Sequence, residues 1–226
     1  YNSLPHPEDQ PEITDRTLIA LGELFVQHRV HDIFGIHLLH SHFTAPEGSI
    51  LLGVKFQMSG STKACWTKPV AVTELKTASI HGHVFHVRTD GTFVPYEFHE
   101  GDAASKAAMV GPAFFQGLAA FLHRNKLTGL VALQALEDCR QNTNMELQIG
   151  PEATVMLDER DVVGMGAIRM TTGWSFRVAD DGIISCKGND VYAPKTNSNH
   201  QVFKDSKPLP DVEALKAALR NEGVIA

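Results

Sequence analysis

Histidine is the residue type in this chain whose placement could support chemistry. The chain has 12 histidines in 226 residues, and nine of them lie between positions 28 and 99. Histidine titrates near neutral pH and is the commonest metal ligand in proteins. The cluster therefore points to acid–base or metal chemistry, and the spacing within it indicates which side chains could act together.

The most specific spacing lies in the segment 77–100, which has the pattern of a β-hairpin. Asp90-Gly91 separates two β-rich runs, as in a two-residue type I′ turn. With that turn, His81 faces Glu100, and His83 lies on the same side of the hairpin. Cross-strand neighbours are about 5 Å apart at Cβ. We therefore predict that His81, His83 and Glu100 converge on one metal ion.

Two imidazoles and one carboxylate suit Fe(II) with open positions, or Zn with a bound water. Such an ion polarises a substrate oxygen or lowers the pKa of its water. Tyr96 shares the face of the predicted metal ligands and could donate a hydrogen bond, and Glu100 could act as an acid. His40 and His42 share one face of another expected strand and could complete or compete with this set. The candidate catalytic residues are Glu100, Tyr96, His40 and His42.

Two interpretations without catalysis stay open beside this one. The protein could be a binding module that holds haem, or another flat ligand, between sheet and helix through one axial histidine. It could also bind a protein partner through residues 188–208, with histidines that only pack in the core. The sequence contains no Walker A lysine motif, no GxSxG elbow and no HExxH pair. No known nucleotide-binding or hydrolase motif therefore supports catalysis by His40, His42 or the hairpin residues.

Three helices are expected to frame these residues. The first begins at Thr14 or Asp15 and ends near Arg29, with apolar residues at three- and four-residue spacing. The second covers 103–125 and is interrupted at Gly111-Pro112. The third follows the capping residue Asp211.

The remaining segments predict short strands. Residues 34–43 and 49–57 read as a hairpin, residues 65–75 as an edge strand, and residues 128–136 as a buried strand or a short helix. Further strands are expected at 145–149, 153–157, 166–170, 174–178 and 183–187. Because regular βαβ alternation is absent, we predict an α+β fold, with a mostly antiparallel sheet and N-terminal, central and C-terminal helices. One domain is expected over 1–226, with an extended arm at 1–13 and a long polar loop at 188–208.

Composition narrows the function classes. Lys and Arg number 20 against 26 Asp and Glu, which gives a net charge of −6. Without a basic patch or a basic amphipathic helix, neither a nucleic acid nor a membrane is an expected partner. Cys65, Cys139 and Cys186 show no CxxC spacing, which favours a reducing, cytoplasmic setting. The expected partner is a small-molecule ligand.

The run His37–Phe43, HLLHSHF, followed by an acidic turn with a glycine, carries one resemblance. It is similar to a segment in a group of uncharacterised fungal proteins of this general size. The likeness covers residues 30–55 and implies a fungal protein, but no activity or site residue comes with it. From the residues alone we expect a small-molecule enzyme of the hydrolysis, hydration or isomerisation type, with a histidine-rich pocket and a divalent metal or histidine acid–base chemistry.

Overall fold

The structure is a computed structural model that describes the chain except for residues 59–61, 76–78, 137–141, 151, 164–168 and 193–207. Its helices are α1 (Asp15–Gln27), α2 (Ser105–Ala108), α3 (Pro112–Arg124) and α4 (Val212–Asn221). Its strands are β1 (Phe34–Leu38), β2 (Ser49–Gln57), β3 (Lys63–Ala71), β4 (Ile80–Val87), β5 (Phe93–Glu100), β6 (Val131–Ala135), β7 (Asn144–Ile149), β8 (Ala153–Asp158), β9 (Met170–Val178) and β10 (Ile184–Tyr192).

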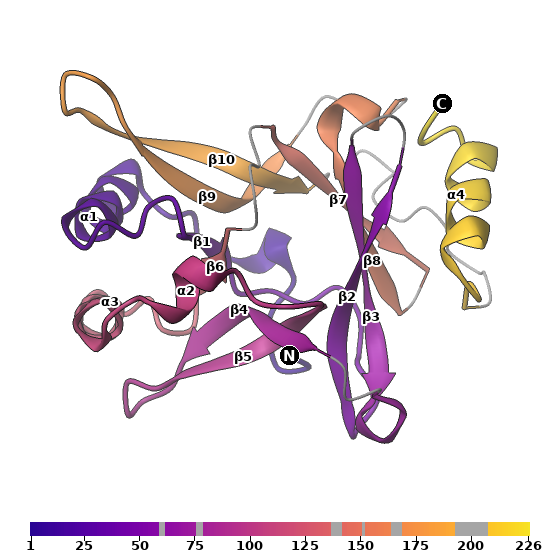
Figure 1. Cartoon of the computed structure of the whole chain (residues 1–226), viewed down its shortest axis with the longest axis horizontal. Coiled ribbons are helices and arrows are strands. Elements are labelled where there is room, and N and C mark those ends of the chain that lie inside the picture. The colour runs from indigo at the N-terminus through magenta and orange to yellow at the C-terminus, as the bar shows by residue number, and fades with distance from the viewer. Residues whose placement is uncertain (59–61, 76–78, 137–141, 151, 164–168, 193–207) are drawn as a thin grey trace.

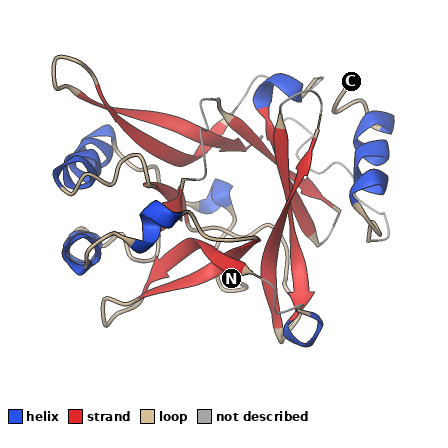
Figure 2. Ribbon diagram, in the orientation of Figure 1, coloured by secondary structure: helices blue, strands red, loops and turns tan. Residues whose placement is uncertain are grey.

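The strands close into one mixed barrel (Figures 1 and 2). Around the barrel their order is β1-β6-β4-β5-β2-β3-β8-β7-β10-β9, and β9 pairs with β1 to close it. The pairs β2–β5 and β7–β10 are parallel, and the other neighbours in this order are antiparallel. An eight-stranded barrel has an interior that side chains fill or that holds one small ligand, and a ten-stranded barrel is wider.

Helices cover two sides of the barrel from outside (Figure 1). On one side α1 and α3 pack on alternate residues of β1 and β6, such as Ile36 and Leu133, through Phe25 and Phe114. On the other side α4 packs on alternate residues of β7 and β8 through Leu215, which is fully buried. Helices α1 and α4 begin at capping residues: the side chain of Thr14 accepts a hydrogen bond from Thr17 N, and that of Asp211 accepts one from Ala214 N.

The other face of the same strands is polar and turns into the barrel. Side chains alternate along a strand, so the residues between the helix-facing ones point inward. On β1 and β6 these are His37 and Gln134, and on β7 they are Glu146 and Gln148, all buried. Buried polar side chains require partners, so a polar lumen is stable only when its groups pair with one another or with a ligand.

The fold differs from the expected α+β architecture with a mostly antiparallel sheet. The sheet closes on itself and contains two parallel pairs, and the described part of the chain is predominantly β with four short α-helices. The predicted positions of the three longer helices are confirmed, since α1, α3 and α4 lie within them. Closure depends on pairings between segments distant in sequence, which local patterns do not encode.

Several strand predictions are also wrong in detail. The first strand ends at Leu38 and pairs with β6 and β9, so it forms no hairpin with β2. A single strand, β9, replaces the two expected at 166–170 and 174–178, of which 166–168 lie outside the described residues. Strand β10 runs to Tyr192, into the expected loop at 188–208, of which 193–207 are not described. Residues 128–136 contain a strand, β6.

Candidate metal centre

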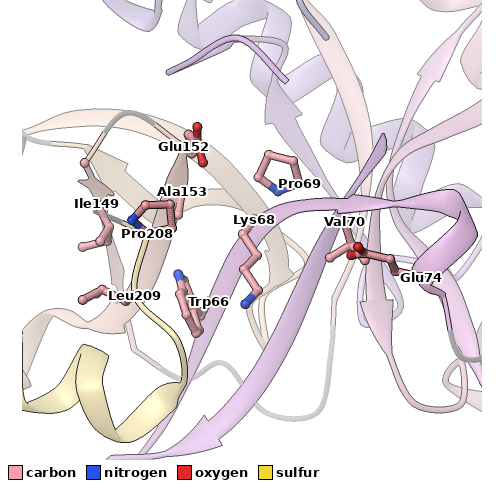
Figure 3. Close-up of a pocket in the computed structure, with 11 residues that line it drawn as sticks. Trp66, Lys68, Pro69, Val70, Glu74, Ile149, Glu152, Ala153, Pro208 and Leu209 are labelled. Atoms are coloured by element: carbon pink, nitrogen blue, oxygen red, sulfur yellow. The ribbon is translucent and has the colours of Figure 1, made fainter. Parts of the chain in front are cut away.

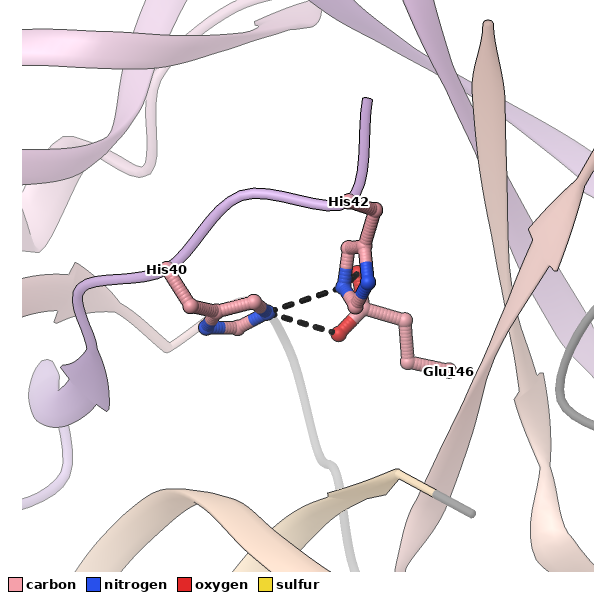
Figure 4. Close-up of side chains that lie close together, drawn as sticks. All are labelled: His40, His42 and Glu146. Carbon is pink, nitrogen blue, oxygen red and sulfur yellow. Dashed lines mark hydrogen bonds and ion pairs between the residues drawn. The ribbon is translucent and has the colours of Figure 1, made fainter. Parts of the chain in front are cut away.

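Two histidines just beyond β1 and one glutamate on β7 meet inside the barrel (Figure 4). β1 ends at Leu38, and Leu39 N donates to Leu130 O at 2.8 Å, which fixes the following segment beside the start of β6. The rings of His40 and His42 turn toward each other and toward Glu146. Glu146 reaches them from β7, which lies three strands from β1 around the barrel, because it occupies an inward position of that strand.

The donor atoms of these residues have the separations expected around a bound ion. His40 Nε2 lies 2.9 Å from His42 Nε2 and 3.3 Å from Glu146 Oε2, and His42 Nε2 lies 3.1 Å from Glu146 Oε1. Ligand atoms bound about 2.1 Å from one ion are about 3.0 Å apart at neighbouring octahedral positions and about 3.4 Å apart at tetrahedral ones. The His40, His42 and Glu146 side chains could therefore hold a metal ion.

The ring of His40 is oriented as in metal-binding histidines. Its Nδ1 lies 2.7 Å from the carbonyl oxygen of Leu38, and a carbonyl can only accept a hydrogen bond. Nδ1 therefore carries the proton, and in the neutral ring Nε2 presents a lone pair to His42 and Glu146. A backbone carbonyl on the second ring nitrogen is a frequent partner of metal-bound histidine.

The charges at the site are set by Glu146. Burial raises the pKa of Glu146, but the charges and hydrogen bonds of His42 and His40 outweigh it and hold that pKa well below its usual range. Burial also lowers the pKa of His40, and there too the hydrogen bond and charge of Glu146 prevail, so the pKa is raised. Without a metal, the stable state is a buried carboxylate paired with a protonated imidazole.

A second layer of buried polar groups supports the site. The His37 ring lies 5.1 Å from the His40 ring between centroids, and His37 Nδ1 lies 3.9 Å from Asp190 Oδ2. Asp190 accepts hydrogen bonds from Gln134 Nε2 at 2.9 Å and Asn144 Nδ2 at 3.0 Å. Burial, with a smaller contribution from the charge of His40, lowers the pKa of His37 to about 4, so this ring is neutral.

The N-terminal arm lies over the site. The hydroxyl of Tyr1 accepts a hydrogen bond from His42 N at 3.0 Å, and Ser41 N donates to Pro5 O at 3.1 Å. The His6 ring meets the His42 ring edge-on at 5.8 Å between centroids, and His6 Nε2 lies 3.4 Å from the hydroxyl of Tyr192. The N-terminal residues therefore cover one side of the candidate cluster, next to His42.

The structure does not bring the predicted ligands His81, His83 and Glu100 together. The turn of this hairpin has three residues, because Arg88 N donates to Thr92 O at 2.8 Å and Gly91 has a φ of 84°. The third residue shifts the pairing by one position, so His81 faces His99, while Glu100 pairs with Ile80 and is exposed. The predicted pairing of His81 with Glu100 is wrong for this reason.

Two bulges in the same hairpin change which side chains point inward. Two residues of β4, His83 and Val84, oppose one position of β5, and Tyr96 is the additional residue on β5. His83 consequently stacks on His99, and Tyr96 packs on Leu39 and Val84 in the interior. Burial, with a smaller effect of Glu97, raises the pKa of Tyr96 well above its usual value, so its hydroxyl stays protonated.

Of the candidate residues, His40 and His42 lie in the cluster, Tyr96 lies in the same interior, and Glu100 lies outside it. The sequence analysis missed Glu146. One signal marked it: a carboxylate stands in the apolar alternation of the predicted strand 145–149, between Met145 and Leu147. Such alternation is usual for a strand with one face in water, so the pattern marks Glu146 as lying on the polar face but does not show that this face turns into the barrel.

A separate pocket of about 370 Å³ lies on the outer face of the barrel (Figure 3). Trp66, Ile149 and Leu209 form its apolar wall, and Glu152 lies at its rim. Lys68 Nζ lies 4.1 Å from the centroid of the Trp66 ring. Trp66 and Ile149 point away from the interior, so this pocket is not part of the metal centre.

Comparison with family models, with curated proteins and with solved structures gave no match to this chain. In the described part of the chain, no helix combines the length and the apolar character that a membrane span requires. Inference about function therefore starts from the chemistry of the barrel interior.

Proposed function

We propose that the chain is a metal-dependent enzyme acting on a small molecule inside the barrel. The observation that carries the proposal is the cluster of His40, His42 and Glu146, with donor atoms 2.9–3.3 Å apart on a buried, polar wall. Three protein ligands leave at least one position for water or substrate, as in catalytic Zn sites and 2-His-1-carboxylate Fe(II) sites. The proposed ion is Zn²⁺ or Fe²⁺.

A bound ion of this kind supplies an activated water or a polarised substrate oxygen, which suits hydrolysis or hydration. Residues of the chain orient the ligands and bind the substrate. Leu38 O orients His40, and Tyr1 fixes the backbone of His42. Burial raises the pKa of Tyr96 and of Tyr192, so both hydroxyls stay protonated as hydrogen-bond donors for a substrate. The arm over the site reduces its contact with bulk water.

A second candidate function is metal-free acid–base catalysis by the same residues. The raised pKa of His40 and the lowered pKa of Glu146 favour it, because together they describe a charged pair that could donate and accept a proton. In this case the closeness of the donor atoms reflects hydrogen bonds rather than ligand positions.

Hydrolysis of 4-nitrophenyl acetate by the untagged chain loaded with Zn²⁺ separates the candidates. The proposal predicts turnover above buffer that a chelator abolishes, that Glu146→Gln abolishes, and that Glu152→Gln at the exposed rim residue leaves unchanged. Turnover that survives the chelator but not Glu146→Gln supports the acid–base pair. No turnover in any state contradicts the hydrolytic assignment and favours a binding module.

A further inference from the structure

A cysteine and a histidine from non-adjacent strands meet elsewhere in the interior. Cys65 Sγ on β3 lies 3.6 Å from His99 Nε2 on β5, and both side chains are buried. This contact joins a thiol to a possible base, which is the arrangement that activates cysteine nucleophiles. None of these atoms belongs to the cluster of His40, His42 and Glu146.

The contact is possible because the strand between them, β2, has a glycine there. Gly53 pairs with His99, and a Cβ at Gly53 would lie 2.5 Å from His99 Cδ2 and 2.8 Å from Cys65 Sγ. Neighbouring strands are about 4.8 Å apart, so the two side chains must reach across the backbone of β2 to meet. Any other residue at position 53 would occupy the space in which they touch.

The His99 ring is held by a second ring. His83, added to the inner face by the bulge in β4, stacks on His99 with 3.7 Å between centroids and 15° between planes. His81 meets His99 edge-on at 6.1 Å and is itself fixed by Gly101 O, 2.8 Å from its Nδ1. His83 is thus a positioning residue that keeps Nε2 of His99 directed at the sulfur.

An exposed lysine on β2 lies beside this pair. Lys55 stands directly opposite Cys65 in the β2–β3 pairing, so its side chain leaves the sheet on the same face, and it is exposed. The ionisable groups nearest the pair along these strands are Lys55 on β2, Lys63 on β3, His81 and His83 on β4, and Glu97 on β5.

Cys186 shows the contrasting environment. It packs against the core under α1, where burial, with a smaller effect of Asp15, raises the pKa of its thiol to about 12. A thiol in that environment is inert near neutral pH. The chain therefore contains its own comparison, a half-buried cysteine whose thiol stays protonated.

We propose that Cys65 and His99 form a second reactive centre, at which the thiol adds to a small activated alkene that enters the barrel. The S–H proton moves to His99 Nε2, and sulfur forms a bond to the β-carbon of an α,β-unsaturated carbonyl compound. The π pair of the alkene moves toward the carbonyl, and the α-carbon takes the proton back from His99. No leaving group, oxidant or further base is needed, which is why this electrophile class fits a thiol with one base.

The test is the alkylation rate of the folded, full-length chain with N-ethylmaleimide, followed for the Cys65 and Cys186 peptides by mass spectrometry. At pH 7 Cys65 is expected to react about 10-fold or more faster than Cys186, and His99→Gln is expected to remove most of that advantage. His83→Phe keeps an aromatic ring in the stack and should retain the Cys65 rate, whereas His83→Ala should lower it and move its pH profile to higher pH. His123→Gln, at an exposed position of α3, is the control.

The same alkylation measurement with a chelator, and in His40→Ala, shows whether the metal centre contributes. The Cys65 rate should not change in either case. Equal rates for Cys65 and Cys186 in the wild-type chain would overturn the proposal even if the variants fail to fold. An unchanged Cys65 rate in folded His99→Gln would also overturn it.

Discussion

His40 Nε2 and Glu146 Oε2 lie 3.3 Å apart inside the barrel, although 106 positions separate the two residues in the sequence. The first follows β1 and the second lies on β7, so closure of the sheet creates the contact. Both side chains are almost fully buried, at 3% and 8% exposed. An ionised group in such a place requires a partner of opposite charge, either a proton on the imidazole or a metal ion.

Glu146→Gln therefore has a specific expected cost in the metal-free chain. The amide keeps the shape of the side chain but not its charge, and it leaves the protonated His40 without a buried counter-ion. Loss of one partner of a buried pair costs about 3 kcal/mol. Urea unfolding in the presence of a chelator should show this decrease in the free energy of unfolding. Glu152→Gln at an exposed position should stay within about 0.5 kcal/mol of wild type, and an equally small effect of Glu146→Gln would contradict the buried ion pair.

His37 should make the stability of the barrel depend on pH. Burial and, to a smaller extent, the charge of His40 lower the pKa of His37 from 6.5 to about 4. Between pH 4 and pH 6.5 this ring is therefore protonated in the unfolded chain and neutral in the folded chain. Its contribution to stability is therefore complete above pH 6.5 and is lost as the pH falls toward 4, by roughly 2 kcal/mol between pH 7 and pH 5. His37→Asn should remove this part of the pH dependence of the urea midpoint. His123→Asn serves as the exposed control, and parallel pH curves for wild type and His37→Asn would refute the prediction.

Much of the local structure could be predicted from the sequence, because local physical signals determine it. Capping residues and apolar spacing placed α1 and α4, and Pro112 placed the start of α3. The barrel could not be predicted in this way, since β1 finds its partners in β6 and β9 rather than in the next strand. Pairing between distant segments leaves no periodic signal in either one.

The candidate site shows the same division. His40 and His42 stand out by their spacing alone, while Glu146 becomes their partner only in the folded chain. The predicted pairing of His81 with Glu100 was wrong because the turn at Gly91 has three residues instead of two. A shift of one residue transfers a side chain to the opposite face, so it removed Glu100 from the predicted site.

Gly53→Ala tests the packing of Cys65 against His99. The added Cβ would lie 2.5 Å from His99 Cδ2, so the ring or the strand must move, at a cost of about 1–3 kcal/mol. Thermal unfolding should show a lower midpoint for this variant. Gly111→Ala is the matched control because nothing lies within 4 Å of its Cβ position. A Gly53→Ala chain as stable as wild type would mean that the two side chains are not fixed in contact.

The N-terminal arm should control how quickly an ion leaves the metal centre. Deletion of residues 1–10 removes the ring of His6 beside His42 and the hydrogen bond to Tyr1, and it opens the site to water. Transfer of Zn²⁺ to a colorimetric chelator, followed by stopped flow, should be about 10-fold faster or more for the truncated chain, since a barrier to solvent access is lost. Tyr1→Phe keeps the ring but loses the hydrogen bond, and an intermediate rate is expected. Identical transfer rates for all three chains would show that the arm is not a barrier.

The most direct test of the account is the metal-binding stoichiometry of the chain, purified without a histidine tag, stripped of metal and titrated with Zn²⁺ in a calorimeter. The account predicts one tight site per chain in wild type and in the double variant His81→Ala/His83→Ala, and loss of that site in His40→Ala/His42→Ala and in Glu146→Gln. Unchanged binding by folded His40→Ala/His42→Ala, or loss of binding only in His81→Ala/His83→Ala, would contradict the assignment of the ligands to His40, His42 and Glu146.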